Sequence, residues 1–205
     1  MVKAVAEEWQ AYLDEPNAQK PRMNIERIYE KVATSPRKYH GASATLALLY
    51  RPINLPNQVA IKHIGDSRVY LQRDGKWRFL TRDHNVLNEL LDEKAQGEGK
   101  SVDFSDYNAE GMAGSLYVLT ECLTIDSDFD SNPMPNYDSQ TISVQAGDCL
   151  VVCTDGVHDL VPCDEWQIIN HQTNLQTWLK TLRKQIYASK GRAYDNATAI
   201  IIRLG

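Results

Sequence analysis

Three aspartates lie at the ends of apolar segments, where their carboxylates could serve as ligands for a divalent cation. Asp66 follows VAIKHIG, Asp155 follows CLVVCT, and Asp195 precedes NATAIIIRL. Strand ends are rigid, so carboxylates placed there can converge with little freedom to drift. Hard cations such as Mg²⁺ and Mn²⁺ prefer oxygen ligands, usually a few carboxylates together with waters. A second interpretation stays open, because an aspartate at a strand end often caps a turn through its own backbone.

The pattern of apolar residues predicts the strands that would position these aspartates. Apolar runs bounded by turn residues predict strands over 43–50, 59–64, 69–72 and 77–80, and runs rich in Val, Ile and Thr predict three more over 141–144, 149–154 and 197–204. Asp74–Gly75 predicts a two-residue turn between two of them. Apolar residues at helical spacing predict helices over 4–13, 24–32, 85–95, 164–170 and 175–187. Strands joined by short hairpins and interleaved with helices favour an α+β fold, in which helices cover antiparallel sheets.

The composition is that of a soluble globular protein. The 205 residues include 22 Lys and Arg against 27 Asp and Glu, a formal charge of −5, and 42% are hydrophobic. The negative charge argues against nucleic acid as a partner. No apolar run approaches the ~20 residues needed to cross a bilayer, and no signal-peptide core is present, so we expect no membrane partner. Four cysteines without a CxxC pair fit a reduced, cytoplasmic protein. No repeat or linker divides the chain, so we expect a single domain over 1–205, with a helical N-terminal part over 1–40.

Several side chains near the aspartates favour structural roles. Arg68 is expected to brace a strand end through hydrogen bonds to a carboxylate. Cys149 and Cys153 alternate along one strand and are expected to be small buried hydrophobes. His84 and His158 are expected to be loop or helix-end residues.

Four sequence motifs, in this order, carry a family resemblance: HIGDSRVYL (63–71), LTRDHN (80–85), GDCLVVCTDGVHDLV (147–161) and DNATAIIIRL (195–204). They resemble the motifs of the metal-dependent protein phosphatases, the type 2C serine/threonine phosphatases, in their bacterial form. GASATLALL (41–49) and LYVLTECL (116–123) resemble two further segments of that family. The resemblance extends over nearly the whole chain.

The resemblance implies an α-β-β-α sandwich of two antiparallel sheets flanked by helices, with metals bound at one end. In the family, a pair of Mn²⁺ or Mg²⁺ ions activates a water that attacks phosphoserine or phosphothreonine in proteins. By matching motif, Asp155 and Asp195 would be ligands of the paired metals, and Asp66 would bind a third, weaker metal. Asn196 would orient Asp195 or a metal-bound water, and Gly156 would lie beside the ligands. No residue is assigned as a catalytic acid or base.

The same resemblance implies further features. Residues 83–114 fall where the family has a flap beside the third metal. The partner would be a phosphorylated protein, and the enzyme would oppose a serine/threonine kinase.

The chain departs from the family pattern at its start. We find neither the Arg and Asn-Glu/Gln-Asp motif nor the Asp-Gly-Met-Gly-Gly segment of the family's first strands. We therefore expect the chain to begin downstream of them, without the metal-bridging aspartate and the phosphate-binding arginine. Exposed sheet edges would then favour self-association.

Three functions stay open on these observations. The first is an active phosphatase whose N-terminal part is longer or is supplied by another polypeptide. The second is a pseudophosphatase that binds a phosphoprotein or a regulatory partner without turnover. The third, outside the family, is a domain that binds divalent cations and has no phosphate chemistry.

Overall fold

The computed structural model describes residues 2–14, 25–33, 42–52, 54–96, 116–125, 134–189 and 196–205. The chain forms two compact units. The first contains residues 1–64 and 121–143, and the second contains residues 65–120 and 144–205. Neither unit is a continuous stretch of sequence. Within the described ranges, every helix falls short of the length and apolar character that a membrane span requires.

The first unit combines two helices with antiparallel strands. The helices are α1 (Val2–Asp14) and α2 (Ile25–Ala33). A three-stranded sheet has the order β2 (Leu46–Tyr50), β3 (Gln58–Ile64) and β7 (Asp138–Ser143), and β1 (Ala42–Ala44) pairs with β6 (Leu123–Ile125). Ile25 and Ile28 of α2 are fully buried and pack with strand residues such as Tyr50 and Leu123.

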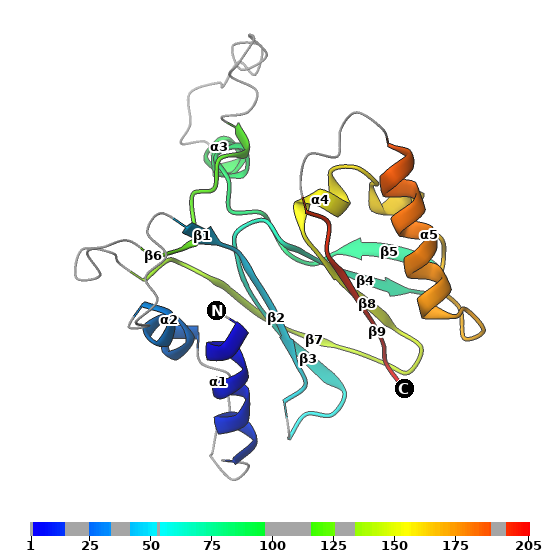
Figure 1. Ribbon diagram of the computed structural model, residues 1–205, viewed down its shortest axis with the longest axis horizontal. Coiled ribbons are helices and arrows are strands. Elements are labelled where there is room, and N and C mark those ends of the chain that lie inside the picture. Colours follow the sequence, from blue (N-terminus) through cyan, green and yellow to red (C-terminus); the bar gives the residue numbers. More distant parts are fainter. Residues whose placement is uncertain are drawn as a thin grey trace. The chain divides into compact units, whose positions relative to one another are not determined.

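The second unit is a four-stranded antiparallel sheet with a long helix over one face (Figure 1). Its strand order is β5 (Lys76–Phe79), β4 (Arg68–Arg73), β8 (Cys149–Cys153) and β9 (Ala199–Arg203). The helices of this unit are α3 (Val86–Gln96), the short α4 (Asp155–His158) and α5 (Leu175–Ala188). Trp178 and Leu182 of α5 are buried in a core with Tyr70 and the thiols of Cys149 and Cys153, as the sequence predicted for both cysteines.

The strand register brings three distant segments of sequence to one end of this sheet. Arg68 pairs with Cys153, and Cys153 pairs with Ala199. Asp66 lies two residues before the start of β4, Asp155 lies two residues after the end of β8, and Asn196 lies three before β9. Because the strands are antiparallel, all three segments leave the sheet at the same end.

The expected α+β class and most of the expected elements are confirmed. The predicted strand over 43–50 is divided into β1 and β2 at Thr45, while β6 and α4 were not predicted as a strand and a helix. Residues 97–115, most of the expected flap, lie outside the described residues.

The helix predicted over 164–170 is wrong. Only Cys163–Glu165 forms a single 3₁₀ turn, and the chain then runs on without helical structure. The buried side chain of Gln72 explains the difference. Its Nε2 donates to the Ile169 carbonyl oxygen at 2.8 Å, and its Oε1 accepts from the Ile169 backbone N–H at 2.7 Å. A side chain from β4 thus takes both backbone groups that a helix would use.

Gln72→Leu should destabilise the fold, because it leaves both backbone groups of Ile169 buried without their partner. We expect a loss of about 2–4 kcal/mol in the free energy of unfolding, measured by urea denaturation. Gln167→Leu, at an exposed position of the same segment, should change stability by less than about 0.5 kcal/mol. Equal effects of the two substitutions would contradict this role of Gln72.

Candidate metal centre

The segments that carry Asp155 and Asn196 are in direct backbone contact. The Thr154 hydroxyl donates to the Asn196 carbonyl oxygen at 3.1 Å and accepts from the Thr198 N–H at 3.1 Å. A Cβ placed on Gly156 would lie 2.8 Å from the same Asn196 oxygen. Glycine is therefore required at 156 by close approach. Asp195, the third predicted ligand, lies outside the described residues.

Asp66 is held by a turn whose backbone is fixed on both sides. Gly65 has a φ of +95°, a conformation that favours glycine. The Gly65 carbonyl oxygen accepts from the His84 N–H at 2.9 Å, and the Gly65 N–H donates to Nδ1 of His84 at 3.3 Å. On the other side, Nε2 of the buried His158 lies 3.1 Å from the Asp66 carbonyl oxygen. Since His158 belongs to α4, this contact joins the turn of Asp66 to the helix that begins with Asp155.

The electrostatics at this end of the sheet favour a bound cation. Burial, together with repulsion from the carboxylates of Asp155, Asp83 and Asp159, raises the pKa of Asp66 to about 6. Burial and the Arg68 guanidinium lower the pKa of His158, so His158 is no source of positive charge at neutral pH. A cation near Asp66 would relieve the repulsion between these carboxylates.

Arg68 has the structural role predicted from the sequence. Its guanidinium donates to both carboxylate oxygens of the buried Asp83, with Nε 2.9 Å from Oδ1. The guanidinium also stacks 5.0 Å from the ring centre of Phe79. Asn88 donates to the Asp83 carbonyl oxygen at 2.9 Å, so Asp83 is fixed at three points. Of the other carboxylates in this group, Asp159 lies 2.9 Å from Nδ1 of His158 and is mostly exposed.

The sequence reasoning missed Asp83, and it expected His158 to be a loop or helix-end residue without giving it a partner in the site. Asp83 holds Arg68 in place, and His158 joins the turn of Asp66 to α4. Both residues stand inside the motifs LTRDHN and TDGVHD, so the motifs marked their position but gave no indication of their partners.

The chain resembles known proteins in sequence. A sequence model described as protein phosphatase 2C matches residues 1–191 of the chain. The serine/threonine phosphatase Stp of Listeria welshimeri is 25% identical over 192 residues, which cover 88% of this chain and 66% of that protein. The chain thus spans just under two thirds of the length of this relative.

Solved structures show the same fold. The serine/threonine phosphatase Stp1 from Staphylococcus aureus superposes with a TM-score of 0.66 at 18% identity, over 99% of this chain and 76% of that one. The catalytic domain of the phosphatase PstP, solved in complex with two manganese ions, gives a TM-score of 0.57 at 20% identity, over 97% of this chain and 80% of that one.

Gly156→Ala should loosen the contact between α4 and the segment of Asn196. The added Cβ would meet only backbone atoms, the nearest at 2.8 and 3.0 Å, so a shift of the main chain is unavoidable. We expect a loss of about 1–3 kcal/mol in the free energy of unfolding, measured by urea denaturation. Gly205→Ala, where nothing lies within 4 Å, is the control, and a Gly156 variant as stable as this control would contradict the close approach.

Asp66→Asn should stabilise the metal-free protein at neutral pH. The folded-state pKa of Asp66 is about 6, above its ordinary value of 3.8. Between these values the folded protein binds more protons than the unfolded chain, so stability falls as the pH rises from about 4 to 6. At pH 7.5 in EDTA we expect the variant to be more stable by about 1 kcal/mol, a figure reduced for solvent screening.

The difference should nearly vanish at pH 4, where Asp66 is protonated in the folded protein. Urea denaturation at both pH values measures this difference in the free energy of unfolding. Asp159→Asn is the matched control and should give a smaller difference, because the Asp159 side chain is 66% exposed. If Asp66→Asn is less stable than wild type at pH 7.5, the carboxylate of Asp66 is not repelled by its neighbours.

Proposed function

The chain belongs to the protein phosphatase 2C family, and on that basis we propose that it hydrolyses phosphoserine and phosphothreonine in proteins with Mn²⁺ or Mg²⁺ as cofactor. The observation that carries the proposal is the group of carboxylates around Asp66 and Asp155 at one end of a sheet, where burial, together with repulsion from the neighbouring carboxylates, raises the pKa of Asp66 to about 6. Because the family match extends through both compact units, we propose that they belong to one phosphatase-type domain.

Asp155 and Asp195 would hold a pair of cations, and Asp66 would hold a third. The donor set fits this assignment, since carboxylate oxygens are the ligands that Mn²⁺ and Mg²⁺ prefer. The PstP structure with two manganese ions supports a pair of cations. The chemistry that bound cations supply is the activation of a water and the neutralisation of phosphoryl charge.

The chain's own residues would position this chemistry. Thr154 and Gly156 hold the Asn196 segment against the start of α4, which fixes Asp155 beside it. Arg68 is hydrogen-bonded to Asp83, so it would stabilise the strand end beside the site and would not bind the phosphate. His158 would keep the Asp66 turn next to α4. The phosphatase names of the relatives favour turnover over a role in binding alone.

The proposed partner is a phosphorylated protein, so the enzyme would oppose a serine/threonine kinase. The four cysteines form no disulfide with one another, which supports a reducing compartment such as the cytoplasm.

Asp155→Asn should abolish metal-dependent turnover, because the variant loses a charged ligand. We expect wild type to hydrolyse p-nitrophenyl phosphate and a phosphothreonine peptide with millimolar Mn²⁺, and Asp155→Asn to fall by about 100-fold or more. Asp159→Asn, four residues further along the chain and exposed, should keep activity within a few fold of wild type. Turnover that survives in EDTA, or in Asp155→Asn, would contradict the proposal.

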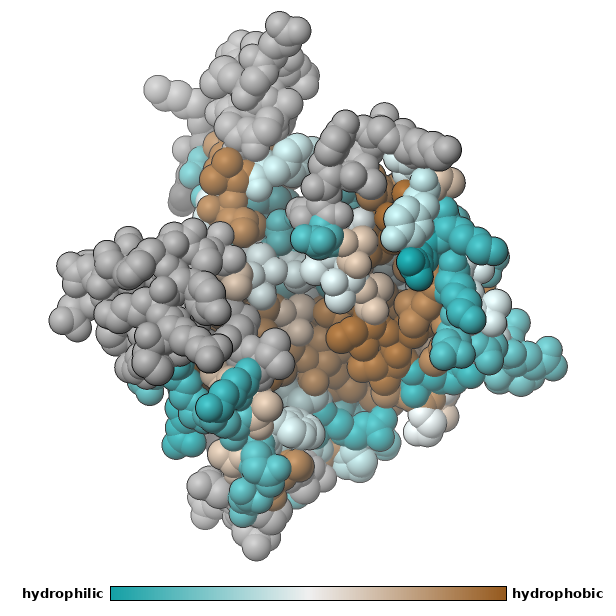
Figure 2. Space-filling model, in the orientation of Figure 1, coloured by the Kyte–Doolittle hydropathy of each residue, from teal (hydrophilic) through white to brown (hydrophobic). Residues whose placement is uncertain are grey.

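We also propose that the chain self-associates through β9. This strand is at the end of the strand order of its sheet, and its Ile200 and Ile202 side chains are 57% and 38% exposed. Figure 2 shows an apolar surface in this region. An exposed apolar edge strand is a template for pairing with another chain.

Ile200→Lys should shift the protein toward monomer, since a lysine on an edge strand opposes strand pairing. Sedimentation velocity over a tenfold range of concentration is the measurement. Leu55→Lys, in the exposed connection between β2 and β3, is the matched control and should sediment like wild type. A wild-type protein that is monodisperse and monomeric throughout would refute the association.

A further inference from the structure

We propose that a pocket between α5 and the start of β9 binds the protein substrate next to its phosphoresidue. The pocket would take a bulky apolar side chain of the substrate, while an acidic residue of the substrate pairs with Arg183. The inference rests on the proposed phosphatase function and adds a preference for acidic, apolar sequences around the phosphoresidue.

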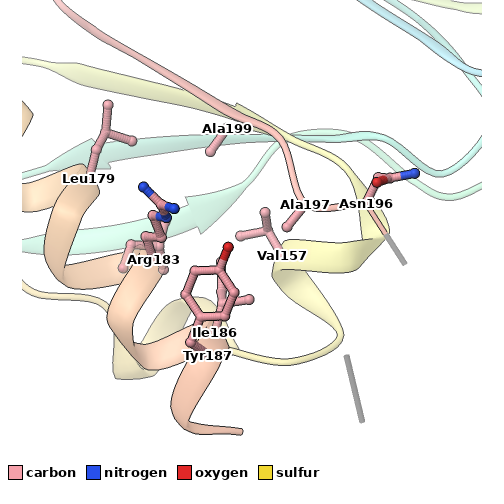
Figure 3. A pocket seen from close by; sticks show the side chains of 9 residues that line it. Val157, Leu179, Arg183, Ile186, Tyr187, Asn196, Ala197 and Ala199 are labelled. Carbon is pink, nitrogen blue, oxygen red and sulfur yellow. The ribbon is translucent and has the colours of Figure 1, made fainter. Parts of the chain in front are cut away.

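The pocket is large enough for a side chain of this kind. Its volume is about 500 Å³, within the range of roughly 300–1,000 Å³ that is common for ligand sites. Its walls are mostly apolar and come from α5, α4 and the segment that leads into β9 (Figure 3). The lining residues that matter here are Val157, Leu179, Ile186 and Ala199, with Arg183 and Asn196 as polar members.

The pocket adjoins the candidate metal centre through shared residues. Asn196 lines the pocket, and its carbonyl oxygen is also in contact with Thr154 and Gly156, the two neighbours of Asp155. Val157, two residues after Asp155, forms another part of the lining. Since an extended peptide advances only about 3.3–3.6 Å per residue, a substrate held at Asp155 would reach the pocket within a few residues.

The charge of α5 selects for acidic substrates. The helix carries Lys180, Arg183 and Lys184 and has no acidic residue, although the whole chain has a formal charge of −5. The guanidinium carbon of Arg183 lies 5.3 Å from the centre of the Tyr187 ring. Figure 3 shows both side chains reaching from α5 toward the segment of Ala197 and Ala199. The guanidinium of Arg183 therefore lies at the margin of an apolar pocket. This arrangement suits a substrate in which an acidic residue lies beside an apolar one.

The test compares labelled phosphothreonine peptides that differ at two positions near the phosphoresidue. One position is Leu or Ser, and the other is Glu or Lys. Affinity is measured by fluorescence anisotropy in EDTA, where no hydrolysis of the peptide is expected, and p-nitrophenyl phosphate turnover is measured in parallel with Mn²⁺. We expect wild type to prefer Leu over Ser by about tenfold and Glu over Lys by about fivefold.

Arg183→Glu is the decisive variant, and Lys184→Glu is its matched control. Both residues are exposed on the same helix and undergo the same change of charge, but only Arg183 lines the pocket. Arg183→Glu should reverse the preference to Lys over Glu, whereas Lys184→Glu should retain the wild-type preference. Tyr187→Ala should reduce the preference for Leu. All three variants should leave p-nitrophenyl phosphate turnover unchanged.

Other outcomes overturn the inference. If Arg183→Glu and Lys184→Glu change the peptide affinities equally, acidic peptides are attracted to the charge of α5 in general and not to this pocket. If wild type binds the Leu and Ser peptides equally well, the pocket does not take an apolar side chain. If Arg183→Glu alters sedimentation but not peptide affinity, the pocket is occupied by a second copy of the chain. A wild type without turnover would refute the proposed function, while its peptide affinities would still decide whether the pocket exists.

Discussion

The register of β8 with its two neighbours is the constraint on which the candidate site depends. Cys153 is paired with Arg68 on one side and with Ala199 on the other. These two pairings bring the turn of Asp66, the start of α4 and the segment of Asn196 to one end of the sheet. A slip of a single residue along either ladder would turn the side chains of that strand to the opposite face. The hydrogen bonds of Thr154 and the absence of a side chain at Gly156 then close the remaining distance.

The charges in this region show a balance between stability and function. Arg68 neutralises Asp83, which is buried and held at several points. Asp66 has no such compensation from the residues that the structure describes, and its carboxylate is disfavoured by burial and by neighbouring carboxylates. A protein selected for stability alone would place a neutral side chain there. An uncompensated carboxylate at a rigid strand end is what a cation site requires.

Much of this arrangement can be predicted from local sequence. Asp74 and Gly75 both adopt positive φ angles, as their turn type requires, and the apolar stripe of 175–187 forms α5 as expected. Local sequence fails where a distant side chain decides the structure. Gln72 determines the backbone around Ile169, and the contact of Gly156 with Asn196 involves residues forty positions apart. The motifs predicted that Asp66 and Asp155 lie near each other, as they do, whereas Asp195 lies outside the described residues and the partner of Arg68 is given only by the fold.

The division of the chain between the two units has a consequence for how the protein folds. The chain leaves the second unit after Thr120, builds strands of the first, and returns only at Val144. β8 therefore finds both of its partners far away in sequence, and their pairing requires the closure of long loops. Contacts of that kind are associated with slow folding. Assembly of the candidate centre must accordingly await the whole sheet, and only a fragment that spans residues 65–205 contains the complete second unit.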